Sequence, residues 1–176
     1  MKKLILIASL WSSAQAQLNG VWVRPCFNGN IQIQNFEVPQ NYTDDLLFQD
    51  IKCSKPLLSF SYDGTSIFRS NEMDYEFSKV RLTLYERSLA EEYNQRSVCG
   101  FTNWTTNSPK VITGLRCALF QQGRQTQVPK QGDRRFGIWK LEAGKLYFGK
   151  LTPTHPANSP ETRPIEWDTR AYFKQL

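Results

Sequence analysis

The hydrophobic and polar positions after residue 17 form short apolar runs separated by Gly, Asn, Pro and Asp, with almost no sustained 3.6-residue period. Apolar and polar residues alternate over 31–34, and alternation returns between Met73 and Glu86. Because successive side chains of a strand point to opposite faces, this pattern indicates strands. The sequence therefore predicts an all-β protein, an antiparallel meander with at most one short helix.

The alternation between Met73 and Glu86 changes parity part-way. The apolar residues before and after the change are Met73, Tyr75 and Phe77, then Val80, Leu82 and Leu84. One extra residue in the strand restores the pattern, so we expect a bulge or bend near Ser78.

Two hairpins are predicted from turn residues between apolar runs. In the segment 136–151, two strands meet at Ala143-Gly144, and both faces of the pair are apolar, so both need cover. The second hairpin would join 56–62 to 65–69 through Asp63-Gly64, a dipeptide that favours tight turns.

The remaining segments give shorter elements. We expect a strand at 21–24, a surface turn of helix at 88–96 capped by Ser88, and a strand at 111–120 interrupted at Gly114. Residues 121–135 are polar and basic and predict a connection. Four prolines in 152–164 predict an extended loop, and 165–176 a final strand that carries Trp167, Tyr172 and Phe173.

The first residues have the pattern of a cleavable secretory signal. Lys2 and Lys3 precede an apolar stretch over 4–11, and Ala14-Gln15-Ala16 matches a small-x-small cleavage site. The alternative, an uncleaved anchor, is disfavoured because a membrane span needs about 20 apolar residues. We therefore expect export to a periplasm or to the medium, with residues 1–16 removed and 17–176 forming one domain.

The cysteines all lie in the predicted mature part, at Cys26, Cys53, Cys99 and Cys117. An even number in an exported chain predicts two disulfides, and the spacings lack the Cys-x-x-Cys pairs of zinc modules. Three pairings are open. We favour Cys26 with Cys53 and Cys99 with Cys117, because each closes a compact local loop.

The triplet Gly20-Val21-Trp22 opens the predicted mature chain, ahead of many short strands, a closing hairpin and a terminal strand. This arrangement resembles the lipocalin-like (calycin) barrels. In that family the tryptophan of Gly-x-Trp lies across the closed end of the barrel, often under an arginine from the last strand. The resemblance implies that Trp22 closes a barrel end and that Arg170 is the matching arginine.

Catalytic patterns are missing from the sequence. His155 is the one histidine and lies in Thr-Pro-Thr-His-Pro, and there is no Gly-x-Ser-x-Gly or phosphate-binding glycine loop. The acidic pairs at 44–45 and 91–92 are neighbours in sequence, so they do not face each other across a cleft. We expect a protein that is not an enzyme and holds no cofactor and no metal.

The charge is moderately basic. The whole chain has a formal net charge of +6, and loss of Lys2 and Lys3 reduces this to about +4. The densest basic group is Arg124, Lys130, Arg134, Arg135, Lys140, Lys145 and Lys150. It predicts either an anionic envelope component as partner or a charged face that keeps an aromatic hairpin soluble; export argues against nucleic acid.

Two functions follow from a secreted barrel without catalytic residues. The first is a binding protein that carries a small apolar ligand in the barrel interior, which would open at the end opposite Trp22. The second is an interaction or inhibitor module with a filled barrel, which contacts a protein or envelope component through the loops 121–135 and 152–164.

Overall fold

A computed structural model describes residues 17–119 and 124–175 of the chain. The predicted signal segment, residues 1–16, lies outside the described residues. None of the described helices is long and apolar enough to cross a membrane.

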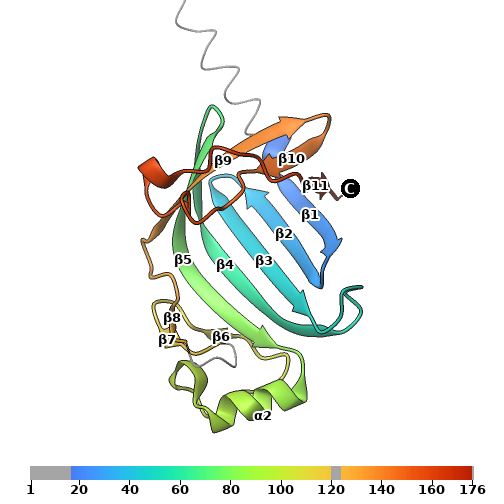
Figure 1. Cartoon of the computed structure of the whole chain (residues 1–176), viewed down its shortest axis with the longest axis vertical. Coiled ribbons are helices and arrows are strands. Elements are labelled where there is room, and N and C mark those ends of the chain that lie inside the picture. The colour runs from blue at the N-terminus through green and yellow to red at the C-terminus, as the bar shows by residue number, and fades with distance from the viewer. Residues whose placement is uncertain (1–16, 120–123, 176) are drawn as a thin grey trace, which may run out of the picture.

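The chain folds into a closed antiparallel barrel of eight strands (Figure 1). The all-β fold that the alternation predicted is confirmed, and so is the barrel that the resemblance implied. Around the barrel the strand order is β1-β2-β3-β4-β5-β9-β10-β11, and β11 returns to β1. The barrel strands are β1 (Gly20–Phe27), β2 (Asn30–Glu37), β3 (Gln40–Phe48), β4 (Pro56–Arg69), β5 (Glu72–Leu84), β9 (Arg134–Glu142), β10 (Lys145–Phe148) and β11 (Tyr172–Lys174).

One end of the barrel is filled by a cluster of buried apolar side chains. Trp22 belongs to this cluster and donates a hydrogen bond from its indole Nε1 to the Leu18 carbonyl at 2.7 Å. The cluster consists of Leu18, Trp22, Phe36, Phe68, Trp139, Leu146 and Tyr172. All seven side chains are less than one-tenth exposed, so they pack this end of the barrel.

A second core lies where β4 and β5 run beyond the barrel (Figure 1). β5 pairs with β9 only over Glu72–Glu76, so its later part is free to pack against α2 (Arg87–Gln95) and the segment that follows. That segment contains η1 (Val98–Gly100), β6 (Lys110–Val111), β7 (Arg116–Cys117) and β8 (Thr126–Gln127).

The expected bulge at Ser78 is confirmed. In the pairing of β4 with β5, Asp63 lies opposite Lys79 and Gly64 opposite Phe77, which leaves Ser78 without an opposite residue. The Ser78 hydroxyl donates to the Asp63 carbonyl at 2.9 Å. The inserted residue explains the change of parity in the sequence.

The predicted hairpin at Asp63-Gly64 is wrong, because β4 runs unbroken from Pro56 to Arg69. Gly64 serves a different purpose there. A Cβ on Gly64 would lie 2.3 Å from the Glu76 carbonyl oxygen and 2.5 Å from Cζ of Tyr75. The glycine is needed for close approach of the neighbouring strand, not for a turn.

The hairpin at Ala143-Gly144 is confirmed, with positive φ angles of 49° and 72°. On its inner face Leu146 pairs with Leu141, and Phe148 with Trp139, next to the Trp22 cluster described above. On its outer face Lys140 Nζ lies 5.2 Å from the centre of the Trp167 ring. The segment after β10 thus supplies the second cover that this apolar hairpin requires.

Arg163 joins that same segment to the seam between β5 and β9. Its guanidinium donates to the Gly137 carbonyl at 2.6 Å and to the Asp74 carboxylate at 2.7 Å. η2 (Pro160–Thr162) precedes it, and the rest of 152–164 is loop, as the prolines predicted.

Three local predictions need correction. The helix has Glu86, not Ser88, as its N-cap, and it is part of the second core because Ala90 and Tyr93 are buried. Within 111–120, the described residues form only the short β6 and β7, separated by a turn at Gly114. The last strand is limited to β11, and Trp167 forms a single bridge with Gly149.

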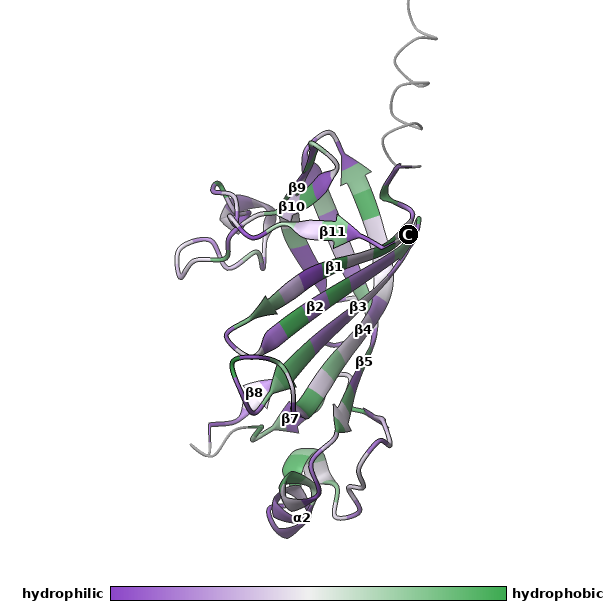
Figure 2. Cartoon of the chain, turned by 90° about the vertical axis from the view of Figure 1, so that its right-hand side faces the viewer, coloured by the Kyte–Doolittle hydropathy of each residue, from purple (hydrophilic) through white to green (hydrophobic). Residues whose placement is uncertain are grey.

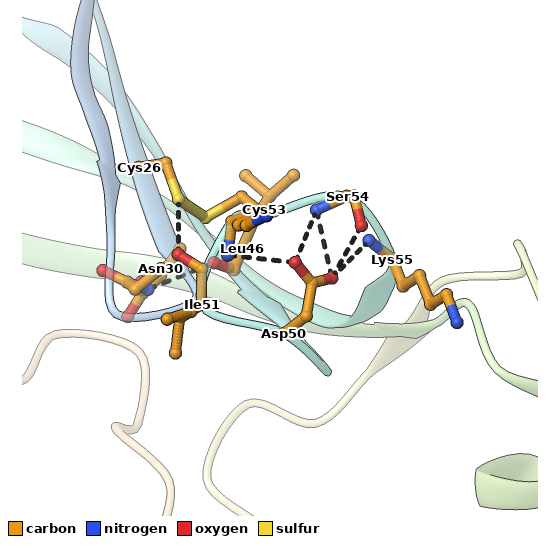
Figure 3. The surroundings of a disulfide bond; sticks show 10 residues. Cys26, Asn30, Leu46, Asp50, Ile51, Cys53, Ser54 and Lys55 are labelled. Carbon is orange, nitrogen blue, oxygen red and sulfur yellow. Dashed lines mark hydrogen bonds between the residues drawn. A yellow bond between two sulfur atoms is a disulfide. The ribbon is translucent and has the colours of Figure 1, made fainter.

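The structure contains the favoured disulfides, Cys26–Cys53 and Cys99–Cys117. The first ties the end of β1 to the β3–β4 loop (Figure 3). There the Asp50 carboxylate accepts backbone hydrogen bonds from Lys52, Ser54 and Lys55. The second disulfide is buried in the second core and links η1 to β7.

Candidate ligand cavity

A cavity of about 800 Å³ begins inside the barrel on the other side of the Trp22 cluster and continues to Ile138, Ala157 and Pro164, where β9 meets the segment after β10. The first residue of β1 to line it is Arg24, two positions beyond Trp22 and on the same face of the strand. Residues 126–129 contribute to its lining from the far end, and the exposed side chain of Leu151 lies at its rim. Cavities of this size hold drug-sized molecules.

One wall of the cavity is polar and comes from β1, β2 and β3. The register places these inward side chains side by side: Arg24 opposite Gln32, and Gln34 opposite Thr43. Asn41 completes the wall. Arg24 donates to the Gln32 side-chain oxygen at 3.0 Å, and Thr43 to that of Gln34 at 2.8 Å.

The facing wall is aromatic and comes from β4 and β5. Phe60 and Tyr62 are stacked with ring centres 6.4 Å apart, and Tyr62 meets Phe77 edge to face at 5.9 Å. Tyr75 packs edge to face on Phe77 at 4.8 Å. Figure 2 shows hydrophilic and hydrophobic residues alternating along the barrel strands. The cavity thus has two walls of unlike chemistry.

Charged side chains of the cavity lining gather around Asp168. Its carboxylate lies 3.2 Å from the Arg24 guanidinium and 2.8 Å from that of Arg170. Burial raises the pKa of Asp168, but the hydrogen bonds from Arg170 and the charges of both arginines outweigh it and hold the pKa below its ordinary value. The hydrogen bond to Asp168 likewise raises the pKa of Arg170. Asp168 stays ionised and is shared by two cations.

Three buried polar atoms that belong to cavity-lining residues have no hydrogen-bond partner among the described residues. They are Nε of Arg24, Oδ1 of Asn41 and the hydroxyl oxygen of Tyr75. Each of these residues is less than one-tenth exposed. Buried polar groups in proteins are nearly always hydrogen-bonded, so these three atoms are exceptions gathered among the residues that line the cavity.

The two residues predicted to close the barrel end lie apart. Trp22 lies in the closed-end cluster, but the cation over its ring is Lys174, whose Nζ is 5.5 Å from the ring centre. Lys174 is directly opposite Trp22 in the β1–β11 register, whereas Arg170 precedes β11. Arg170 instead lies 5.1 Å over the Phe27 ring and lines the cavity.

The basic group of the sequence does not form one surface. Only Arg135 and Lys150 line the cavity. Arg134 pairs with Glu76 at 2.7 Å, and Lys140 with Glu142 at 2.7 Å. These two pairs neutralise Arg134 and Lys140.

The residues considered for chemistry are likewise dispersed. His155 lies in the loop after β10, where its Nδ1 is 3.1 Å from the Thr154 hydroxyl. In the described part of the chain, no group of three or more His, Cys, Asp and Glu is placed to hold a metal ion.

The burial of several tyrosine side chains predicts that the protein becomes less stable at alkaline pH. Burial raises the pKa of Tyr62 to about 12, and it also raises the pKa of Tyr75. A raised pKa keeps these phenols protonated in the folded state while they ionise near pH 10 in the unfolded chain. The contribution of these tyrosines to the free energy of unfolding should therefore be constant between pH 8 and 10 and then fall, by up to about 1.4 kcal/mol per pH unit for each such tyrosine.

Urea denaturation between pH 8 and 11 measures this fall. Tyr62→Phe should make the decline shallower, while Tyr42→Phe, on the exposed face of β3, should leave it unchanged. A free energy of unfolding that stays constant up to pH 11 contradicts the prediction.

No protein-family model matches this chain, and a search of curated proteins finds no similar sequence. The site is therefore interpreted from its own geometry. Sequence reasoning missed the polar wall. The alternation over 31–34 located β2 but did not show that Gln32 and Gln34, rather than the two isoleucines, face the interior.

Proposed function

We propose that this is an exported, non-catalytic binding protein that holds a small ligand inside the barrel. The observation that supports this proposal is the cavity, which has one polar and one aromatic wall. An apolar body would pack on Phe60, Tyr62 and Phe77, while a polar group would take the hydrogen bonds offered by β1–β3. The polar wall changes the expected ligand from wholly apolar to amphipathic.

Membership of the lipocalin-like (calycin) barrels is part of this proposal. It is supported by the closed eight-stranded antiparallel architecture and by the position of Trp22 at the closed end. Export is supported by the two disulfides, which form and persist in oxidising compartments.

A second candidate function is contact with a partner through the loops around the cavity. Large apolar side chains are exposed in two separate segments: Ile51 in the β3–β4 loop is 74% exposed and Ile165 after β10 is 73% exposed. Exposed apolar residues are typical of interaction sites when they are contiguous. The cavity favours the carrier over a filled barrel, because a filled barrel would leave no comparable internal volume.

Blocking the cavity tests the proposal. Thr43→Trp places a large ring in the polar wall, so binding of 1-anilinonaphthalene-8-sulfonate should weaken at least about tenfold, as expected when a ligand's space is filled. Tyr42→Phe, the neighbour on the outer face, should bind the probe like the wild type. Fluorescence titration gives the affinity, and thermal unfolding verifies that both variants fold.

Equal probe affinity in the folded Thr43→Trp variant and the wild type would contradict binding inside the barrel. The proposal would be overturned if the wild type bound neither this probe nor dodecanoate nor 1-naphthaleneacetate.

A further inference from the structure

We propose that the ligand enters and leaves the cavity through the side of the barrel, between β8 and the segment that follows β10. This inference rests on the proposed function and deepens it, because it assigns the entry route to named side chains. The lateral route replaces the opening expected at the end of the barrel opposite Trp22.

Three of the barrel strands are much shorter than their neighbours at the seam. β9, β10 and β11 contain 9, 4 and 3 residues, whereas β4 and β5 contain 14 and 13. Figure 1 shows β9–β11 at one end of the barrel, while β4 and β5 continue toward α2. β1 pairs with β11 only at Trp22 and Val23, and β5 pairs with β9 only as far as Glu76. Beyond these pairs, no barrel strand in the described part of the chain lies between β1 and β5.

The end of the cavity opposite Trp22 is closed by the second core. Three apolar side chains line the cavity there and belong to that core: Val80, Leu119 and Val128. They are 0%, 7% and 4% exposed. A ligand that passed this way would have to expose apolar side chains that are buried together, which the hydrophobic effect opposes.

The exposed residues of the cavity lining lie on the side that lacks a barrel strand. They are Thr126 and Gln127 of β8, Arg135 of β9, and Lys150 and Leu151 after β10. The lining residues that the described strands β1–β5 contribute are all buried or half-buried. Side chains that line a cavity and also contact solvent form its mouth. The mouth therefore lies in the side wall, where β9–β11 leave the barrel incomplete.

Backbone hydrogen bonds hold both borders of this mouth. On one border the Lys150 N–H donates to the Glu166 carbonyl at 2.8 Å. On the other, the Val128 N–H donates to the Leu115 carbonyl at 2.9 Å. The mouth is thus part of the folded structure, and exchange of a ligand does not require a barrel strand to detach.

A polymer attached at the mouth tests the route. All four cysteines are in disulfides, so a single introduced cysteine can be labelled with maleimide–polyethylene glycol without reduction. Leu151→Cys carries the polymer at the mouth, and Glu91→Cys carries it on α2, which packs in the second core at the other end. The positions are matched in exposure, since Leu151 and the Glu91 side chain are both 59% exposed.

Stopped-flow fluorescence of 1-anilinonaphthalene-8-sulfonate gives the association and dissociation rates of each variant with and without the polymer. The polymer on Leu151→Cys should lower both rates at least about fivefold, because it obstructs the path to the cavity. The equilibrium affinity should stay within about twofold, because the contacts inside the barrel are unchanged. The polymer on Glu91→Cys should leave both rates within about twofold.

The outcomes separate the two proposals. If Leu151→Cys does not fold, Gln127→Cys places the polymer on the opposite border of the mouth and should give the same result. Rates that fall only with the polymer on Glu91→Cys, fall equally at both positions or stay unchanged at both would overturn the lateral route and leave the binding function standing. If the wild type binds neither this probe nor dodecanoate nor 1-naphthaleneacetate, the proposed function itself fails.

Discussion

Replacing Gly64 with alanine should destabilise the barrel by about 3 kcal/mol. The new Cβ would lie 2.3 Å from the Glu76 carbonyl oxygen, a backbone atom of β5 that moves only if the strand moves. It would also lie 2.7 Å from the Tyr75 hydroxyl. The added methyl group therefore pushes apart β4 and β5, the two strands that form the aromatic wall.

Urea denaturation gives the change in the free energy of unfolding. Gly137→Ala is the matched control, because Gly137 also lies in a barrel strand and its nearest neighbour, the Met73 carbonyl oxygen, would be 3.5 Å from the new Cβ. That variant should remain within about 1 kcal/mol of the wild type. Equal stability of the two alanine variants would contradict the close approach at Gly64.

Removal of the Cys99–Cys117 disulfide should lower the free energy of unfolding by about 3 to 5 kcal/mol. The bond closes a loop over a sequence separation of 18 residues. Cys117 is fully buried against the second core, so a Cys99→Ala, Cys117→Ala variant also loses packing. The effect should be measured on purified protein without reducing agent.

The Cys26–Cys53 bond provides the comparison. It spans a similar separation of 27 residues, but Cys26 is exposed. A Cys26→Ser, Cys53→Ser variant should therefore lose about 3 kcal/mol, mostly through the loop entropy of the unfolded chain. A larger loss at this exposed bond than at the buried one would show that burial in the second core does not add to the stabilisation.

The sequence predicted the barrel because its evidence is local. Alternation located the strands, the parity change located the bulge at Ser78, and Gly144 between two apolar runs located the hairpin turn. Local evidence also misled: Asp63-Gly64 has the composition of a turn, but close strand packing is what requires that glycine. Turn propensity and close approach select the same residue, so the sequence does not separate them.

The site depends on register, which a single sequence specifies less well. Arg170 was assigned to the Trp22 ring from its position near the C-terminus, but β11 starts two residues later and aligns Lys174 with Trp22. Likewise, Asp168 and Arg24 are far apart in the chain, and no periodic pattern in the sequence predicts that they pair. Strand alternation shows which residues share a face, but barrel closure decides which face is inside.

The central claim is that a small ligand binds between the polar wall and the aromatic wall. Intermolecular nuclear Overhauser effects between a bound probe, dodecanoate or 1-naphthaleneacetate, and assigned aromatic and methyl protons of the protein test it most directly. The claim predicts contacts to the rings of Phe60, Tyr62 and Phe77 inside the barrel. Contacts confined to the exposed side chains of Phe27, Ile51 and Ile165 would place the probe on the loops and contradict it.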